Sequence, residues 1–218
     1  MIKLSSEELY YVHYWKTPKF QKNISTGLSQ MYLSRLAYLA SFIKDNGEPQ
    51  FPNYHSGEDY VKIHHPSAVG SFMKINNSAA QLWWSEMERD NLIVKHGDEY
   101  AINENYFYIG DMPESVRRMV LAGNAKVCAV PKYLIRELYH SGIEHGGFDL
   151  SLFLRILPCV GIDGKLYLPE LKKECFTPLT TLQLSQFLHK RKLKTNNPTK
   201  KEGQDCQDLI YRMVFITV

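Results

Sequence analysis

One stretch of the 218-residue chain, residues 76–111, restricts the fold more than any other: NNSAAQLWWSEMERDNLIVKHGDEYAINENYFYIGD. Its first part predicts a helix that ends near Asp90, with four apolar residues at helical spacing expected to face inward: Ala79, Leu82, Trp83 and Met87. The segments LIVK and YAIN are typical of strands, and HGDE between them is typical of a hairpin turn. The sequence therefore predicts a helix that leads directly into a polar-tipped hairpin, a surface suited to entering a groove.

Two further helices are predicted before this stretch. The first carries apolar side chains every three or four positions across residues 28–43, with Ser25 or Thr26 as its N-cap. Residues 47–60 hold two Pro and two Gly and are expected to form a loop. The segment HPSAVGSFMK is expected to form a short helix with proline in its first turn. The resulting order over residues 24–110 is helix, helix, turn, helix and two strands, which is the order of a winged helix-turn-helix.

The second half of the chain again alternates helices with short apolar strands. KVCAV and KLYLP are expected to form strands, and PKYLIRELYHSG and FDLSLFLRILPCV are expected to form helices. Residues 180–188 and 201–213 then predict two helices separated by a basic polar turn, and VFITV begins a strand. A second winged unit needs a returning strand at this point, so either its wing is absent or the chain is shortened.

These elements predict an α+β, mainly helical fold with tandem winged helix-turn-helix units, the second of them incomplete if its wing is absent. The expected organisation is an N-terminal lead-in over residues 1–23, a winged helix-turn-helix domain over 24–111, a connector over 112–125, and a second helical, winged-helix-like domain over 126–218. The apolar helices of the second domain can supply either its core or the face of a homodimer, and we expect the core.

The composition supports a folded domain that acts inside the cell. The chain is 44% hydrophobic and 22% charged, which is enough to bury a core. It contains no run of 18 apolar residues and begins without an apolar segment and cleavage site, so we expect neither a membrane span nor a secretion signal. Four cysteines without a C-x-x-C pair, expected to be reduced thiols, predict no zinc site: Cys128, Cys159, Cys175 and Cys206.

The segment LIVKHGDEYAINENYFYIGD resembles winged helix-turn-helix proteins of Firmicute plasmids, phages and mobile elements. In that family the recognition helix is followed by Gly-Ile-Ile, a hairpin, and N-x-x-Y-F-[FY]-x-G. The matching positions here are Leu92-Ile93-Val94, Asn103, Tyr106, Phe107, Tyr108 and Gly110. YLIRELYH, HGGFDLSLFLRILPCV and FTPLTTLQLSQFL match the downstream region in order, so the resemblance covers residues 25–215. It implies a DNA-binding regulator or replication initiator in the cytoplasm of a bacterial host cell.

The first predicted contact surface is the helix-turn-helix and its hairpin. One helix fits the ~12 Å major groove, and the N-terminal part of the second helix faces the bases. Asn and Gln there can pair bidentately with adenine, whereas the acidic residues Glu86, Glu88 and Asp90 lie at the far end of the helix. The alternative is ordinary helix capping and a solvated turn. The predicted contacts are Lys74, Asn76, Asn77, Ser78 and Gln81, with Lys95 and His96 at the hairpin tip.

The second predicted contact surface is basic. Residues 1–110 contain 10 Lys and Arg against 12 Asp and Glu, whereas residues 111–218 contain 16 against 11. HKRKLKTNNPTKK holds six Lys and Arg and no acid, so it can bind phosphates in a salt-dependent manner. The alternative is a flexible solvated loop. The predicted contacts are Lys190, Arg191, Lys192, Lys194, Asn196, Asn197, Thr199, Lys200 and Lys201.

Enzyme signatures are missing from the sequence. The two adjacent histidines in VKIHHP do not match the His-apolar-His pattern of a rolling-circle nuclease, and no P-loop, G-x-S-x-G or H-E-x-x-H motif occurs. His140 and His145 lack partners at metal-ligand spacing. We therefore assign no catalytic residue, no metal and no cofactor.

Three hypotheses for the function follow. The first is sequence-specific binding of double-stranded DNA for transcriptional regulation on a mobile element or phage. The second is replication initiation, in which the units bind origin repeats and recruit host replication proteins. The third is a winged-helix adaptor that binds protein, which the acidic end of the predicted recognition helix favours.

Overall fold

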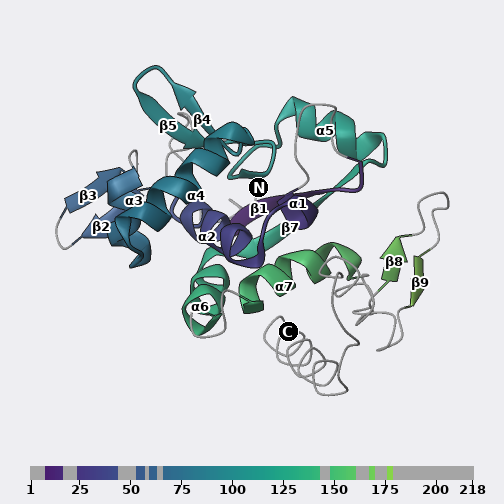
Figure 1. The fold of residues 1–218 in the computed structure, drawn as a ribbon. Helices are drawn as coiled ribbons and strands as arrows, with labels where there is room; N and C mark the ends of the chain where they lie inside the picture. The colour runs from purple at the N-terminus through teal and green to yellow at the C-terminus, as the bar shows by residue number, and fades with distance from the viewer. Residues whose placement is uncertain are drawn as a thin grey trace. The chain divides into compact units, whose positions relative to one another are not determined.

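The computed structural model describes residues 8–16, 24–43, 53–56, 59–62, 66–142, 148–160, 167–169 and 176–178 (Figure 1). The chain divides into two compact units, Met1–Leu154 and Arg155–Val218. The described helices and strands are mixed along the chain and form small antiparallel sheets, which confirms the predicted α+β class. None of these helices is long and apolar enough to cross a membrane.

The helices include most of those that the apolar spacing predicts. The described helices of the first unit are α1 (Ile24–Gly27), α2 (Gln30–Ala40), α3 (Pro66–Met73), α4 (Asn77–Arg89), α5 (Glu114–Leu121) and α6 (Lys132–Gly142). Further along the chain are α7 (Phe148–Ile156) and the 3-10 helix η1 (Leu157–Cys159), so the predicted helix over 148–160 tightens at its end, around Pro158. The helices predicted over residues 180–188 and 201–213 lie outside the described residues.

The strands pair locally except in one sheet. The hairpins are β2 (Asn53–Ser56) with β3 (Asp59–Lys62), β4 (Ile93–His96) with β5 (Glu99–Ile102), and, in the second unit, β8 (Tyr167–Pro169) with β9 (Phe176–Pro178). The sheet that joins distant segments contains β1 (Glu8–Tyr14), β6 (Phe107–Tyr108) and β7 (Ala125–Pro131).

β1 is the central strand of this three-stranded sheet. It pairs antiparallel with β6, where Tyr11 lies opposite Phe107, and with β7, where Tyr11 lies opposite Cys128. Leu9 and Tyr11 are fully buried, as expected for a strand with neighbours on both sides. Burial raises the pKa of Tyr14, near the end of the strand, to about 12. β1, which lies within the predicted N-terminal lead-in, therefore belongs to the core.

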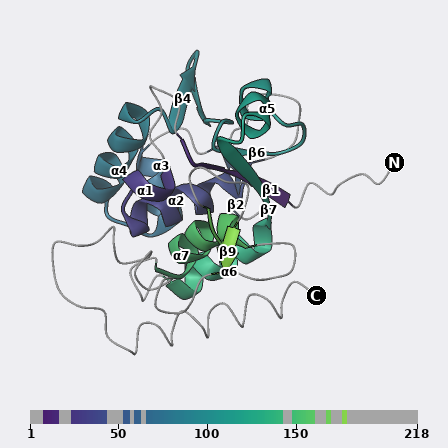
Figure 2. The same ribbon diagram turned by 90° about the vertical axis from the view of Figure 1, so that its right-hand side faces the viewer.

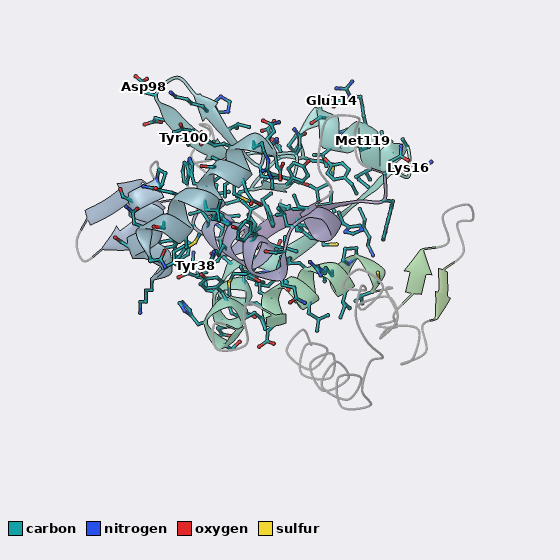
Figure 3. All side chains as sticks on the ribbon, viewed as in Figure 1. Lys16, Tyr38, Asp98, Tyr100, Glu114 and Met119 are labelled. Carbon is teal, nitrogen blue, oxygen red and sulfur yellow. The ribbon has the colours of Figure 1, made fainter. Side chains whose placement is uncertain are left out.

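α2 connects the sheet with the helices that follow it. It lies between the α3–α4 pair and the sheet in both views (Figures 1 and 2). The ring of Tyr38, labelled in Figure 3, stacks on that of Tyr139 in α6 at 3.9 Å between centroids and on that of Phe72 in α3 at 5.1 Å. Such aromatic pairs add to the stabilisation by burial alone. Tyr38 thus joins three helices in one core.

α6 also holds the chain just after α2. Lys132 donates from Nζ to the carbonyl of Ile43 at 2.7 Å, and the Arg136 guanidinium donates to the carbonyl of Ser41 at 2.7 Å. The guanidinium lies over the Phe42 ring, and burial lowers the pKa of Arg136. These bonds satisfy backbone carbonyls of the segment that follows α2.

Two local predictions before α3 are wrong. Ser29, not Ser25 or Thr26, caps α2, because its hydroxyl accepts from the Tyr32 N–H at 3.2 Å and the short helix α1 lies ahead of it. The predicted loop over residues 47–60 contains β2 and the start of β3, because NYHS and DYVK pair as a hairpin despite the Pro and Gly around them.

Candidate nucleic-acid interface

α3 and α4 are consecutive helices that pack on each other and are joined by residues 74–76. Lys74 directly follows α3, and its φ of 53° is left-handed. The Ile75 N–H donates to the Gly70 carbonyl at 3.0 Å and the Lys74 N–H donates to that of Ser71 at 3.3 Å, the two bonds of a Schellman motif. A Cβ on Gly70 would lie 3.4 Å from the Cβ of Ala80, so the two helices cross closely at this glycine. The turn is therefore fixed by its own backbone bonds.

Asn76 begins α4 as its N-cap. Its Oδ1 accepts from the Ala79 N–H at 2.7 Å. Asn77 and Ser78, whose side chains are also typical of N-caps, instead lie exposed in the first turn. A bidentate pair with adenine needs the amide oxygen as well as the amide nitrogen. Asn76 cannot make that pair while it caps the helix, whereas Asn77 does not have this constraint.

The rest of α4 divides into a buried and an exposed face. The buried residues are Ala80, Trp83, Trp84 and Met87. At ~100° per residue the exposed positions cover an arc of roughly 140°. They are Asn77, Ser78, Gln81, Leu82, Ser85, Glu88 and Arg89, preceded by Lys74 in the turn.

The inward orientation predicted for Leu82 is wrong. Its side chain is 58% exposed, and Trp84, at 3% exposed, takes the inward direction instead. The ring of Trp84 packs edge-on against Tyr100 of the hairpin, with 5.2 Å between ring centroids. Trp84 is therefore buried against the hairpin, and Leu82 lies on the exposed face of α4.

The charge of the exposed face changes along α4. Residues 74–85 contain one lysine and no carboxylate. Further along, Arg89 pairs with Asp90 at 3.3 Å and with Glu86 at 3.8 Å. The hydrogen bond to Asp90 raises the pKa of Arg89. The C-terminal end of the helix is therefore acidic overall, and the arginine there is already compensated.

The β4–β5 hairpin is the predicted wing. Gly97, at the first position of its two-residue turn, has a φ of 62°, which a type II′ turn requires. Lys95 and His96 lie exposed on β4, and the register places them opposite Tyr100 and Glu99. With Asp98 at the tip, the exposed end of the hairpin has mixed charge (Figure 3).

A hydrogen-bond network fixes the base of the wing to the end of α4. Asn91 has a φ of 56°, and the Leu92 N–H donates to the Met87 carbonyl at 2.8 Å, so α4 also ends in a Schellman motif. Asn103, 5% exposed, donates from Nδ2 to the Asn91 carbonyl at 2.7 Å, and its Oδ1 accepts from the Asn105 N–H at 3.0 Å. The wing and the helix are thereby held together.

The predicted contacts fall into two groups in the structure. The turn and the exposed face of α4 bring together Lys74, Asn77, Ser78 and Gln81, while Lys95 and His96 lie on the wing. Sequence reasoning missed Leu82 and Ser85 on the same face, although both lie three or four residues from Ser78 or Gln81. The predicted basic contacts over residues 190–201 lie outside the described residues.

Comparison with known proteins found no matching family model, no similar curated protein and no similar solved structure. Within the part of the chain that the structure describes, no three His, Cys, Asp or Glu side chains gather closely enough to hold a metal ion. Cys128 and Cys159 are buried.

Proposed function

We propose that the chain binds double-stranded DNA sequence-specifically, with α4 in the major groove and the β4–β5 hairpin beside the phosphate backbone, and that it catalyses no reaction. The observation that carries the proposal is the exposed face of α4. It presents amide and hydroxyl groups without a carboxylate from Lys74 to Ser85, on the second helix of a helix-turn-helix. These are side chains that pair with base edges, in the position from which such a helix contacts them.

Affinity and specificity are assigned to different parts of the chain. The exposed face of α4 carries little positive charge, so it supplies few phosphate contacts. The segment HKRKLKTNNPTKK, with its six Lys and Arg, is proposed to supply them. Phosphate contacts hold a protein on the duplex, whereas base contacts give the sequence preference. This division explains how a recognition helix with little charge can serve a DNA-binding protein.

The test is selection of the full chain on random duplex DNA at two salt concentrations, followed by sequencing. We expect an enriched motif and an affinity that falls steeply with salt. Replacing Lys190, Arg191 and Lys192 by Ala should weaken binding to all duplexes alike and lower the salt slope by about 3. Gln81→Ala should instead alter the enriched motif. No enrichment at either salt concentration contradicts the proposal.

Transcriptional regulation in a bacterial cytoplasm is the process we propose. It predicts a single palindrome over a promoter, bound by a homodimer and read by host transcription proteins. Replication initiation predicts repeated sites at an origin, with local melting on binding and recruitment of host replication proteins. Footprinting on the element that carries the gene distinguishes the two arrangements.

A protein-binding adaptor is the second candidate, because one surface favours it. Residues 86–99, which form the end of α4 and the wing, contain five carboxylates against Arg89 and Lys95. Such a surface repels phosphate and attracts a basic partner. Asp98→Lys at the exposed wing tip separates the candidates. If the wing lies beside DNA, the change strengthens binding to DNA. If the chain is an adaptor, it does not bind DNA before or after the change.

A further inference from the structure

Leu82 is an apolar side chain on the exposed face of α4 that is proposed to contact DNA. A single exposed leucine is ordinary on a protein surface. Among the described residues, however, the large exposed apolar side chains are Leu82, Leu121 and Tyr133, and Leu82 differs from the others by its neighbours. It lies on the same face of α4 as Ser78, Gln81 and Ser85, the groups proposed to contact bases.

The spacing of these residues fits a short run of base pairs. At a rise of 1.5 Å per residue, Ser78 and Ser85 are roughly 10 Å apart along the helix axis, about three base-pair steps of ~3.4 Å. Leu82 directly follows Gln81 in the middle of this run. The Ser85 hydroxyl donates to the Gln81 carbonyl at 2.9 Å, so its oxygen faces outward as an acceptor.

The chemistry of the face matches an A·T pair better than a G·C pair. Guanine presents two acceptors to the major groove, which Arg or Lys meets best, and residues 77–85 contain neither. Adenine presents one acceptor and one donor, which a glutamine amide matches. Thymine carries a C5-methyl group, which an apolar side chain can cover.

We propose that α4 recognises an A·T pair, with the Gln81 amide on the adenine edge and the Leu82 side chain on the thymine methyl group. This inference rests on the proposed DNA binding and adds the base pair that α4 selects. It gives Leu82 the role of a specificity-determining residue.

The experiment uses the full chain and duplexes of the enriched motif in which each thymine is replaced, one at a time, by uracil. This change removes one methyl group and nothing else. At one position we expect the affinity of the wild type to fall about fourfold, the effect of removing one buried carbon from an apolar contact. Leu82→Ala should bind the unmodified duplex no more tightly than the wild type binds the uracil duplex. Its affinity should not change further when uracil replaces thymine. Replacing the paired adenine by 7-deazaadenine should lower the affinity of the wild type about tenfold. The same replacement should leave the affinity of Gln81→Ala unchanged.

Leu121→Ala is the matched control, because it makes the same change at a leucine 81% exposed on α5. It should keep both the affinity and the response to uracil. An enriched motif without a uracil-sensitive position, or a Leu82→Ala variant that still responds to uracil, overturns the inference and leaves DNA binding standing. The absence of any motif overturns the proposed function itself. Unchanged thermal unfolding of Leu82→Ala shows that the fold is intact, as expected for an exposed side chain.

Discussion

The two ends of α4 are built for different purposes. Its first half exposes Ser78, Gln81 and Leu82, which contact little of the fold. Its second half is anchored, because Trp84 packs on the wing and Asn103 ties the wing to the end of the helix. A binding surface is more precise when a rigid element carries it. We therefore expect substitutions of Trp84 and Asn103 to change stability, and those of Ser78, Gln81 and Leu82 to change binding.

Trp84→Ala should have the largest effect on stability. It removes a buried indole between α4 and Tyr100, which costs about 3–5 kcal/mol in the free energy of unfolding. Urea denaturation followed by circular dichroism measures this cost. Leu82→Ala, two residues away, is the control and should stay within about 0.5 kcal/mol of the wild type. Equal losses for the two variants would show that the halves of α4 do not differ as described.

Asn103→Ala should have the next largest effect. It leaves the Asn91 carbonyl and the Asn105 N–H without their side-chain partner at the base of the wing, at a cost of about 2 kcal/mol. Asn77→Ala removes the same chemical group from the exposed face and should leave the unfolding midpoint nearly unchanged. Hydrogen exchange of the wing amides gives a second measurement, since faster exchange in Asn103→Ala alone is expected.

Asn76→Ala should cost about 1 kcal/mol, because it removes the N-cap of α4. Asn76→Asp keeps an oxygen on the Ala79 N–H and should retain the stability, while its negative charge weakens binding to DNA. Comparing unfolding and DNA titration for both variants separates the two roles. A stable Asn76→Ala would mean that the cap bond contributes little.

Lys74→Gly should have the smallest effect on stability, and it should stabilise the protein where the other variants destabilise it. The left-handed conformation of Lys74 destabilises the fold by about 1–2 kcal/mol, and glycine removes this strain. Glycine also has more conformational freedom in the unfolded chain, which offsets part of the gain, so the free energy of unfolding should rise by about 0.5 kcal/mol. Asn91→Gly in the equivalent motif at the end of α4 should change the stability less, since Asn tolerates this conformation. Lys74→Gly should also lower the salt slope of DNA binding by about 1. An unchanged slope would place Lys74 away from the phosphates.

Local patterns predicted the helices α3 and α4 and the β4–β5 hairpin closely. Helical spacing located α3 and α4, and the Gly97 turn between two apolar segments located the wing. The same spacing misassigned Leu82, because residues 79–87 contain more apolar side chains than one helix face can bury. The hairpin packs on Trp84, so Trp84 is buried and Leu82 is not. This is a tertiary contact, which the spacing of apolar residues along one helix cannot predict.

The central position of β1 could not be predicted in this way. Its partners β6 and β7 begin more than 90 residues further along the chain, and nothing in ELYYVHY specifies them. The hairpin of β2 and β3 was missed for a different reason, since Pro and Gly around it are typical of loops. The basic contacts predicted over residues 190–201 rest on charge alone and lie outside the described residues, so they stay a prediction.

The central strand also has a consequence for synthesis of the protein. β1 is synthesised before β7, which completes its pairing and ends at Pro131. At ~10 residues per second, translation of the intervening chain takes on the order of ten seconds. During that time an aromatic strand has two open edges, each able to pair with another nascent chain. Crowded ribosomes on one message would therefore favour aggregation through β1, and slower initiation of translation would raise the soluble yield.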